Sequence, residues 1–306
     1  MRELAPQSRS STGKKRSYNE MQTANLEEAG PSVSFEDAKS LLPTPPSSHH
    51  HISRDVRLKV NLLAWLGENR YDPALEVSLQ PQNGIKRSTN ASLCQHFMPH
   101  LKEHLLRRLD CQFSGNDTST LGQITAQDRN RVHFVNNRIF KHKVLRVNYT
   151  TYDLRRAQDS LNSRTHADFM TLPPNNSEVQ AEFGDNQFPY HFGWIIGIFH
   201  AMVLCDTVSG SQVNEPQHMK FLFVRWFTPD QGYHGGWKAK RLHRIRFVDG
   251  DDDDAFGFLD PQEIIRGVHL IPAFHHGQSS DLLPPSIIAR PASDQDQDWN
   301  YFYVNM

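Results

Sequence analysis

Three histidines, His96, His100 and His104, follow one another at intervals of four residues. On a helix this spacing places imidazoles over one point, as in many zinc sites. Pro99 ends the helix before His96, so only His100 and His104 share the helix, and a zinc site needs a third ligand. No His-Glu-x-x-His motif is present either. We therefore predict partly exposed helix histidines and no metal site.

The acidic residues offer no better catalytic centre. Asp249 and Asp251–Asp254 form one run, and neighbouring aspartates in a loop seldom hold two metal ions ~4 Å apart, as two-metal nucleases do. An enzyme, such as a remnant nuclease or transposase, would need carboxylates from separate strands to converge: Asp153, Asp168, Asp249 and Asp260. The chain has no Gly-rich phosphate loop, no Gly-x-Ser-x-Gly elbow and no Cys-x-x-Cys pair. We predict no catalytic residue and no cofactor.

Two stretches combine cations with aromatic residues. Residues 128–166 hold nine Lys or Arg against three Asp, and residues 220–246 hold seven against one, although the whole chain has a formal net charge of −1. Cations neutralise phosphates and aromatic rings stack on bases. Alternatively, the aromatic residues fill the core and the charges are the solvated face of the same strands. The candidate nucleic-acid-binding residues are Arg138, Lys141, Lys143, Arg146, Arg155, Arg156, Lys238, Lys240, Arg241 and Arg244.

The aromatic residues also allow a second kind of binding site. A ring of Trp and Tyr at the mouth of a barrel can hold a methylated ammonium group, as on a histone tail, by cation–π attraction. The candidates for such a cage are Trp194, Trp226, Tyr233 and Trp237. The alternative is that these side chains simply fill the core.

The predicted helices lie in the first half of the chain, after an N-terminal tail. Residues 1–54, rich in Ser, Thr and Pro, cannot bury enough apolar surface to fold, so we predict a disordered tail. A helical region follows at 55–127. Its first helix has apolar residues from Leu58 to Leu66 at helical spacing and is capped by Ser53. Its second helix begins near Pro99, with Leu101, Leu105 and Leu109 on one stripe.

Residues 128–306 have the texture of β-structure. Alternating or β-branched segments predict strands at 143–149, 192–205, 219–227, 268–274 and 301–306, with bends or bulges at Gly193 and Gly197. Asp260 to Glu263 resembles a capping box that starts a short helix ending at Gly267. The predicted fold class is α+β, with a small, partly closed β-barrel-like domain.

Composition favours an intracellular protein. The N-terminus lacks the apolar core of a signal peptide, and the three cysteines are too few and too scattered for a secreted disulfide scaffold. The longest apolar stretch, 194–205, is shorter than the ~20 residues that cross a bilayer. A small basic cluster at 13–16 favours the nucleus, with the cytoplasm as the alternative.

Four segments carry a resemblance to a known family: 145–162 (LRVNYTTYDLRRAQDSLN), 194–200 (WIIGIFH), 223–227 (FVRWF) and 256–274, which runs from FGFLDP to GVHLIPAF. They resemble a family of mushroom-forming fungi found as the C-terminal part of long proteins linked to KDZ- and Plavaka-type transposable elements. The order of the last three segments is also similar to that of bromo-adjacent homology (BAH) domains. The resemblance implies a shortened copy without the transposase core, which would be an interaction module.

The expected function is therefore non-catalytic binding of chromatin or nucleic acid in the nucleus. The expected partners are DNA, RNA or histone tails, with no membrane and no small-molecule substrate. The alternatives are the remnant enzyme described above and a decayed reading frame without selected function.

Overall fold

The computed structural model describes residues 49–53, 57–75, 97–114, 124–151, 153, 155–173, 190–206, 215–236, 239–290 and 292–305. All of them belong to one unit that spans Pro45–Met306. Most of the predicted disordered tail, residues 1–48, lies outside the described residues. Its last residues form strand β1 (His50–Ile52) instead, because Ile52 is buried and the segment pairs with a later strand.

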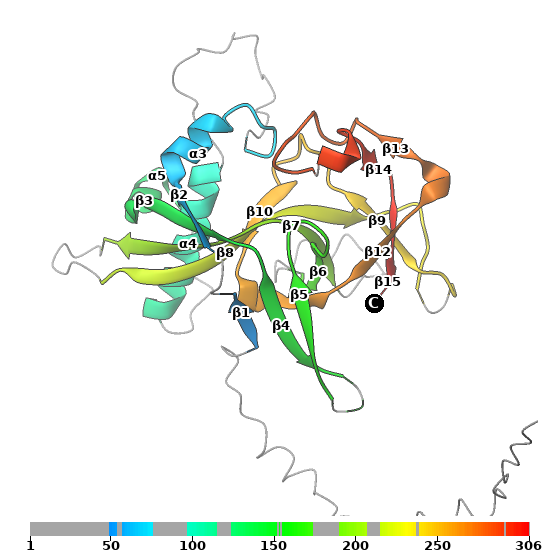
Figure 1. The fold of residues 1–306 in the computed structure, drawn as a ribbon, viewed down its shortest axis with the longest axis horizontal. Helices are drawn as coiled ribbons and strands as arrows, with labels where there is room; N and C mark the ends of the chain where they lie inside the picture. The colour runs from blue at the N-terminus through cyan, green and yellow to red at the C-terminus, as the bar shows by residue number, and fades with distance from the viewer. Residues whose placement is uncertain are drawn as a thin grey trace, which may run out of the picture. The chain divides into compact units, whose positions relative to one another are not determined.

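Two long antiparallel strands form the spine of the main sheet: β7 (His191–Cys205) and β8 (Gln217–Pro229) (Figure 1). They confirm the strands predicted from their β-branched and aromatic residues. The register between them shifts between Ile195 and Gly197, which confirms a bulge at this glycine. A Cβ on Gly197 would lie 2.3 Å from the Phe199 ring, so the close approach of that ring requires glycine.

The spine strands are long enough to share their outer edges among several partners. β7 pairs with β6 (Asp168–Thr171) near its start and with β3 (Val132–His142) along its second half. β8 pairs with β10 (Phe256–Leu259) and then with β9 (His243–Phe247). The remaining strands are β2 (Arg57–Asn61), beside β3, β11 (Ile264–Gly267), beside β6, and β15 (Phe302–Asn305), between β9 and β12 (His269–Pro272).

This strand order makes the main sheet open. The path β11-β6-β7-β8-β9-β15-β12 ends in β11 and β12, which do not pair with each other. The predicted α+β class with mostly β-structure is therefore confirmed, but the described strands form no closed barrel. The reason is that β3 and β6 share one edge of β7, so the sheet branches instead of curling round.

Two smaller sheets accompany the main one. β1, β4 (Leu145–Thr150) and β5 (Arg156–Leu161) form a three-stranded antiparallel sheet. β13 (Gln278–Ser279) and β14 (Asp298–Trp299) form a short two-stranded pair. The strand predicted at 143–149 corresponds to β4.

The helices gather near β2 and β3 (Figure 1). They are α3 (Leu62–Glu68), α4 (Phe97–Ser114) and α5 (Ala126–Asn130). α4 confirms the second predicted helix, and its stripe of Leu101, Leu105 and Leu109 is buried. The first predicted helix is wrong in its first half: Leu58 lies in β2, and α3 starts only after Asn61, whose side chain accepts a hydrogen bond from the Ala64 amide. Within the described residues, no helix is long and apolar enough to cross a membrane.

The spine is covered on both faces. Near β3, one face packs through Phe199 and Phe221 against α3 and α4. Further along, the other face packs through Ile198 and Leu222 against the three-stranded sheet. A third apolar cluster joins the far end of the spine to β9, β12 and β15. These layers bury the large apolar residues that the strand patterns contain.

One local prediction needs correction. Asp260 does cap a helical turn, accepting a hydrogen bond from the Gln262 amide, but the turn is a 3-10 turn, η4 (Pro261–Glu263). The chain then continues as β11 and not as a helix to Gly267. The buried, β-branched Ile264 opposite Thr171 of β6 accounts for the extended backbone.

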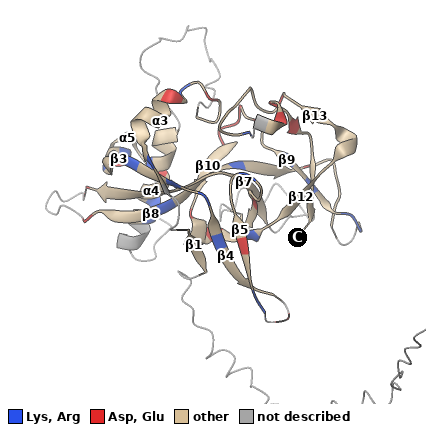
Figure 2. Cartoon of the chain, viewed as in Figure 1, with Lys and Arg blue, Asp and Glu red and all other residues tan. Residues whose placement is uncertain are grey.

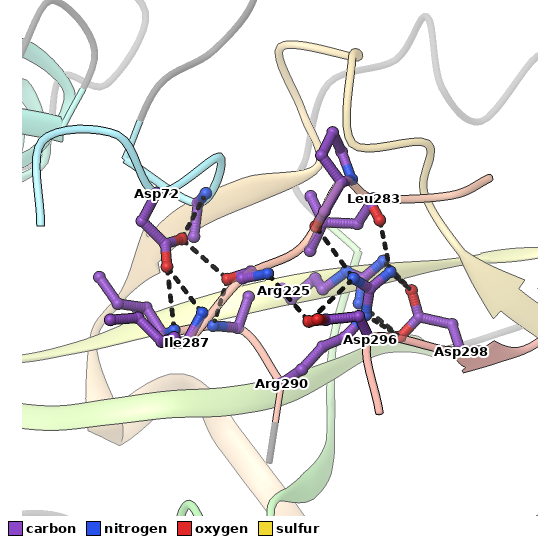
Figure 3. A network of polar contacts seen from close by, with 12 residues as sticks. Asp72, Arg225, Leu283, Ile287, Arg290, Asp296 and Asp298 are labelled. Atoms are coloured by element: carbon purple, nitrogen blue, oxygen red, sulfur yellow. Dashed lines mark hydrogen bonds and ion pairs between the residues drawn. The ribbon is translucent and has the colours of Figure 1, made fainter. Parts of the chain in front are cut away.

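Buried polar groups fix the segment after β13 to the rest of the fold (Figure 3). Arg225 of β8 donates two hydrogen bonds of 2.9 Å to Asp298, and Arg290 donates to the same carboxylate at 2.7 and 3.2 Å. Burial opposes ionisation of Asp298, but the hydrogen bonds from both arginines outweigh it and hold its pKa below the usual value. Asp72 accepts hydrogen bonds from the Ser286 hydroxyl and the Ile287 and Ile288 amides.

Candidate nucleic-acid interface

The first predicted basic stretch follows β3, β4 and β5. Of its candidate residues, the exposed ones are Arg138 and Lys141 on β3, Lys143 in the turn after it, and Arg155 and Arg156 at the hairpin between β4 and β5. Arg146 is half-buried on β4. Arg155 forms an ion pair of 3.0 Å with Asp153 of the same turn. The structure therefore spreads these cations over three strands and two connections.

The candidate residues of the second stretch lie in the connection between β8 and β9 and in β9 itself, at the other end of the main sheet from β3 (Figure 2). Lys240 and Arg241 are exposed, and Lys238 lies outside the described residues. Arg244 is already paired: its Nε donates to Asp230 Oδ2 at 2.7 Å. The structure does not bring the candidate cations of this connection together with those of the first stretch into one docking face.

Two of the cage candidates, Trp194 and Trp226, do not face each other. Trp194 stands opposite Arg225 and Trp226 opposite Gly193, so the two tryptophans are at successive positions of the ladder and point to opposite faces. Trp226 stacks on the ring of His191 at 4.3 Å. Trp237 lies outside the described residues.

Tyr233 does hold a cation on its ring, but this cation belongs to the chain. The guanidinium carbon of Arg244 lies 4.2 Å from the centroid of Tyr233 and 4.5 Å from that of Tyr301. An arginine fixed between two aromatic rings and paired with Asp230 stabilises the β8–β9 connection. This aromatic surface is therefore occupied by the fold itself.

The acidic candidates also stand on separate elements, and His100 and His104 both lie on α4. Asp153 lies in the β4–β5 turn, Asp168 on β6, Asp249 after β9, and Asp260 at η4, where it pairs with Arg108 at 2.6 Å. Within the described ranges, no three His, Cys, Asp or Glu side chains gather as a metal site. His96 lies outside them. Burial and the nearby Arg108 lower the pKa of His104 to about 3, so this imidazole is neutral.

A different group of residues does come together, on the face of the sheet opposite α3 and α4. Pairing across four strands places Lys59 of β2 beside Phe140 of β3, Phe140 beside His200 of β7, and His200 beside Lys220 of β8. His218 lies two residues from Lys220 and therefore on the same face. We call this surface the histidine face; it consists of Lys59, Arg138, Phe140, His142, His200, His218 and Lys220.

The rings of the histidine face form a continuous stack. Phe140 and His200 are stacked at 4.6 Å with an angle of 7° between their planes, and His200 and His218 at 4.4 Å with 28°. Phe140 is half-buried and His218 is exposed, so the stack reaches from the sheet to its surface. Flat rings in this arrangement offer a π surface on which a further ring can stack.

Hydrogen bonds fix the histidines beneath this surface. The Nδ1 atom of His142 donates to the Ser53 carbonyl at 3.0 Å, which leaves its Nε2 as an acceptor. His200 Nδ1 then donates to His142 Nε2 at 2.6 Å. His142 and His200 are buried, so this chain of bonds holds the two rings in place. Such a preorganised platform loses little entropy when a ligand binds.

Cations stand around the stack. Lys59 and Arg138 are exposed on β2 and β3, and Lys220 is half-buried on β8. Sequence reasoning selected Arg138 but missed the histidines and Lys59. The signal was present in the alternation Phe140-x-His142 and His218-x-Lys220, which places aromatic and basic residues on one face of a strand. This alternation could not show that β3 and β8 both lie beside β7, the strand that carries His200.

A groove of about 270 Å³ opens beside the histidine face, where β8 meets β1 and η4. It is lined by His50, Ile52, Arg108, His218, Lys220, Asp260, Pro261 and Gln262. From Leu222 to Arg225 the edge of β8 pairs with the strand β10. At Lys220 this edge has the Arg108 side chain as its partner, which donates a hydrogen bond of 2.5 Å to the Lys220 carbonyl. His218 and Lys220 belong to both the groove and the histidine face.

Comparison of this chain with protein-family models, with curated proteins and with solved structures gives no match.

Proposed function

We propose that this protein is a non-catalytic binding module that holds single-stranded nucleic acid on the histidine face. The observation that carries the proposal is the stack of Phe140, His200 and His218 on one face of the sheet. Bases stack on aromatic side chains with little regard to sequence, and a sheet face is a recurrent platform for this contact.

The charges around the stack support the same ligand. Lys59, Arg138 and Lys220 lie on three different strands around the aromatic rings, so a strand whose bases stack at the centre has cations near its phosphates. Electrostatic contacts to phosphates make binding salt-dependent. A duplex would bring its phosphates close but keep its bases stacked on one another, so these bases would not reach the ring stack.

The wider setting is part of the proposal. The resemblance to transposon-associated proteins of mushroom-forming fungi and to BAH-like modules favours a nuclear protein that acts near DNA, RNA or chromatin. Recognition of a methylated histone tail is the less favoured version, because Trp194 and Trp226 point to opposite faces and Tyr233 already carries Arg244.

Fluorescence anisotropy with labelled oligonucleotides tests the proposal. We expect the full chain to bind single strands of about 12 nucleotides more tightly than a duplex of the same length, with affinity that falls as salt rises. Phe140→Ala should weaken single-strand binding about tenfold, the size of one lost stacking contact. Phe274→Ala is the matched control, because Phe274 is an exposed ring that packs on Trp299 away from the histidine face.

Absence of single-strand binding at low salt, or an equal effect of the two phenylalanine variants, would overturn the proposal. Because Phe140 is half-buried, circular dichroism must show that the variant is folded. Lys59→Ala and Arg138→Ala, both at exposed positions, provide a second test that does not depend on an aromatic residue.

A further inference from the structure

The groove beside the histidine face contains one well-placed cation and little else that attracts an anion. Lys220 lines it, and its neighbour Arg108 is already engaged, with one nitrogen on the Lys220 carbonyl and another 2.6 Å from Asp260. The two carboxylate oxygens of Asp260 are engaged as well, one with Arg108 and the other with the Gln262 amide. The groove therefore offers the Lys220 ammonium to a phosphate.

The same groove contains neutral hydrogen-bond acceptors. His50 Nε2 donates to the Ile264 carbonyl at 2.6 Å, which fixes its tautomer and leaves Nδ1 as an acceptor. Burial lowers the pKa of His50, against the hydrogen bond to Ile264 that raises it, so the ring is neutral at pH 7. The exposed side chain of Gln262 adds an amide oxygen. Acceptors of this kind bind hydroxyl groups, and they bind no phosphate oxygen.

A ligand that matches the groove must therefore combine a phosphate with a neighbouring hydroxyl. The volume of about 270 Å³ is just under the lower end of the range for drug-sized ligands, which suits one sugar-phosphate unit better than a whole nucleotide. Because His218 and Lys220 belong to the groove and to the histidine face, a strand stacked on the face continues directly into the groove.

We propose that the groove binds a ribose-phosphate unit, with Lys220 on the phosphate and His50 and Gln262 on the 2′-hydroxyl, so that the module prefers RNA to DNA. This inference rests on the proposed function, because the histidine face must first hold the strand. It adds a selectivity that the ring stack cannot supply, since stacking does not distinguish ribose from deoxyribose.

Two oligonucleotides that differ only in the 2′-hydroxyl test the inference. We expect the full chain to bind an all-uridine RNA of about 12 nucleotides roughly fivefold more tightly than the deoxyuridine strand of the same length, the effect of about one hydrogen bond. His50→Phe removes the acceptor and should bring this ratio close to one, chiefly by weakening RNA binding. His50→Gln is the matched control, because its amide can still donate to Ile264 and accept from a hydroxyl, and it should keep the preference.

The outcomes separate this inference from the proposed function. Equal affinity of the unaltered chain for the two strands, or an unchanged ratio in both His50→Phe and Gln262→Leu, overturns the ribose assignment and leaves binding by the histidine face intact. If neither strand binds, both ideas fail. Gln262 is exposed on η4, so Gln262→Leu gives a readout even if His50→Phe disturbs the packing of β1.

Discussion

Two polar clusters lie on opposite faces of the main sheet, and they differ in what their charges do. On one face, Arg225 is fully buried and donates both terminal nitrogens to Asp298. On the other face, Lys59 and Arg138 are exposed around stacked aromatic rings. Arg225 and Arg138 were equal members of the basic stretches in the sequence. The difference teaches that only a cation without an internal partner, such as Lys59 or Arg138, is available to the ligand that we propose.

Arg244 reinforces this lesson, because sequence reasoning selected it for nucleic acid. The fold uses its charge on Asp230 and its flat guanidinium on Tyr233 and Tyr301. Buried or stacked arginines hold the molecule together, and the exposed cations of the histidine face are available to a ligand. Five substitutions test this division between structural and binding charges, in order of the expected change in stability.

The largest effect should follow from Asp298→Ala. It leaves Arg225 and Arg290 buried without their shared carboxylate, and an uncompensated buried charge costs about 3–5 kcal/mol. Urea unfolding measures the loss. The matched control is Asp296→Asn, which removes a half-exposed charge 4.0 Å from Arg290 but keeps an oxygen for the Ser286 amide, and which should change the stability by less than about 1 kcal/mol. Equal losses in the two variants would contradict a special role for Asp298.

Asp168→Asn should have the next largest effect, in the opposite direction. Asp168 lies across Trp194 from Arg225, and desolvation raises the pKa of its carboxyl from the ordinary value of 3.8 to about 7. Between these two pKa values the folded protein keeps a proton that the unfolded chain releases. The free energy of unfolding therefore falls as pH rises from about 4 through 7.

At pH 8 the asparagine variant should accordingly be more stable than the unaltered chain by about 2–4 kcal/mol, and at pH 4 the difference should be small. Thermal unfolding at both pH values measures the change. Asp153→Asn, in the exposed β4–β5 turn, is the control and should show no such gain. If Asp168→Asn and the unaltered chain have the same unfolding temperature at every pH, the Asp168 carboxyl is not desolvated.

Asp72→Ala comes third. It removes the acceptor for the Ser286 hydroxyl and for the amides of Ala74, Ile287 and Ile288, and a buried donor left without a partner costs about 1–3 kcal/mol. Hydrogen exchange should quicken at Ile287 and Ile288 before the rest of the sheet opens. The exposed Asp281→Ala is the comparison. Unchanged exchange at these two amides would mean that Asp72 does not hold the segment.

Lys59→Ala and Arg138→Ala should have the smallest effect on stability, within about 0.5 kcal/mol, because exposed side chains away from packing contribute little. Their effect should appear in binding instead. Each lost phosphate contact should lower single-strand affinity and reduce the salt dependence by about one ion. A clear loss of stability without a loss of affinity would place these cations with the structural arginines.

Much of the architecture was predictable from local pattern. The apolar runs of β7 and β8, the leucine stripe of α4 and the terminal strand β15 are the elements that the sequence indicates, because period and residue type set them locally. β2 and β11 were predicted as helix. Leu58 and Ile264 are extended because neighbouring strands supply the backbone hydrogen bonds, which a single segment does not reveal.

The candidate site was predictable only in kind. The interleaving of cations and aromatic rings predicts a surface for nucleic acid, and Arg138, one of the predicted residues, is exposed on β3. Phe140, His200 and His218 are separated by 60 and 18 positions in the numbering, and only the pairing of β3, β7 and β8 stacks their rings. Their spacing carries no signal of that contact.

The amino-acid sequence by itself determined the strands of the spine, the main helix and the local excess of positive charge, because these depend on near neighbours in the chain. The tertiary structure alone decided which charges are paired internally and which rings stand side by side. Ion pairing and stacking act over a few ångströms in space, and strand pairing brings within that reach residues that the chain keeps far apart.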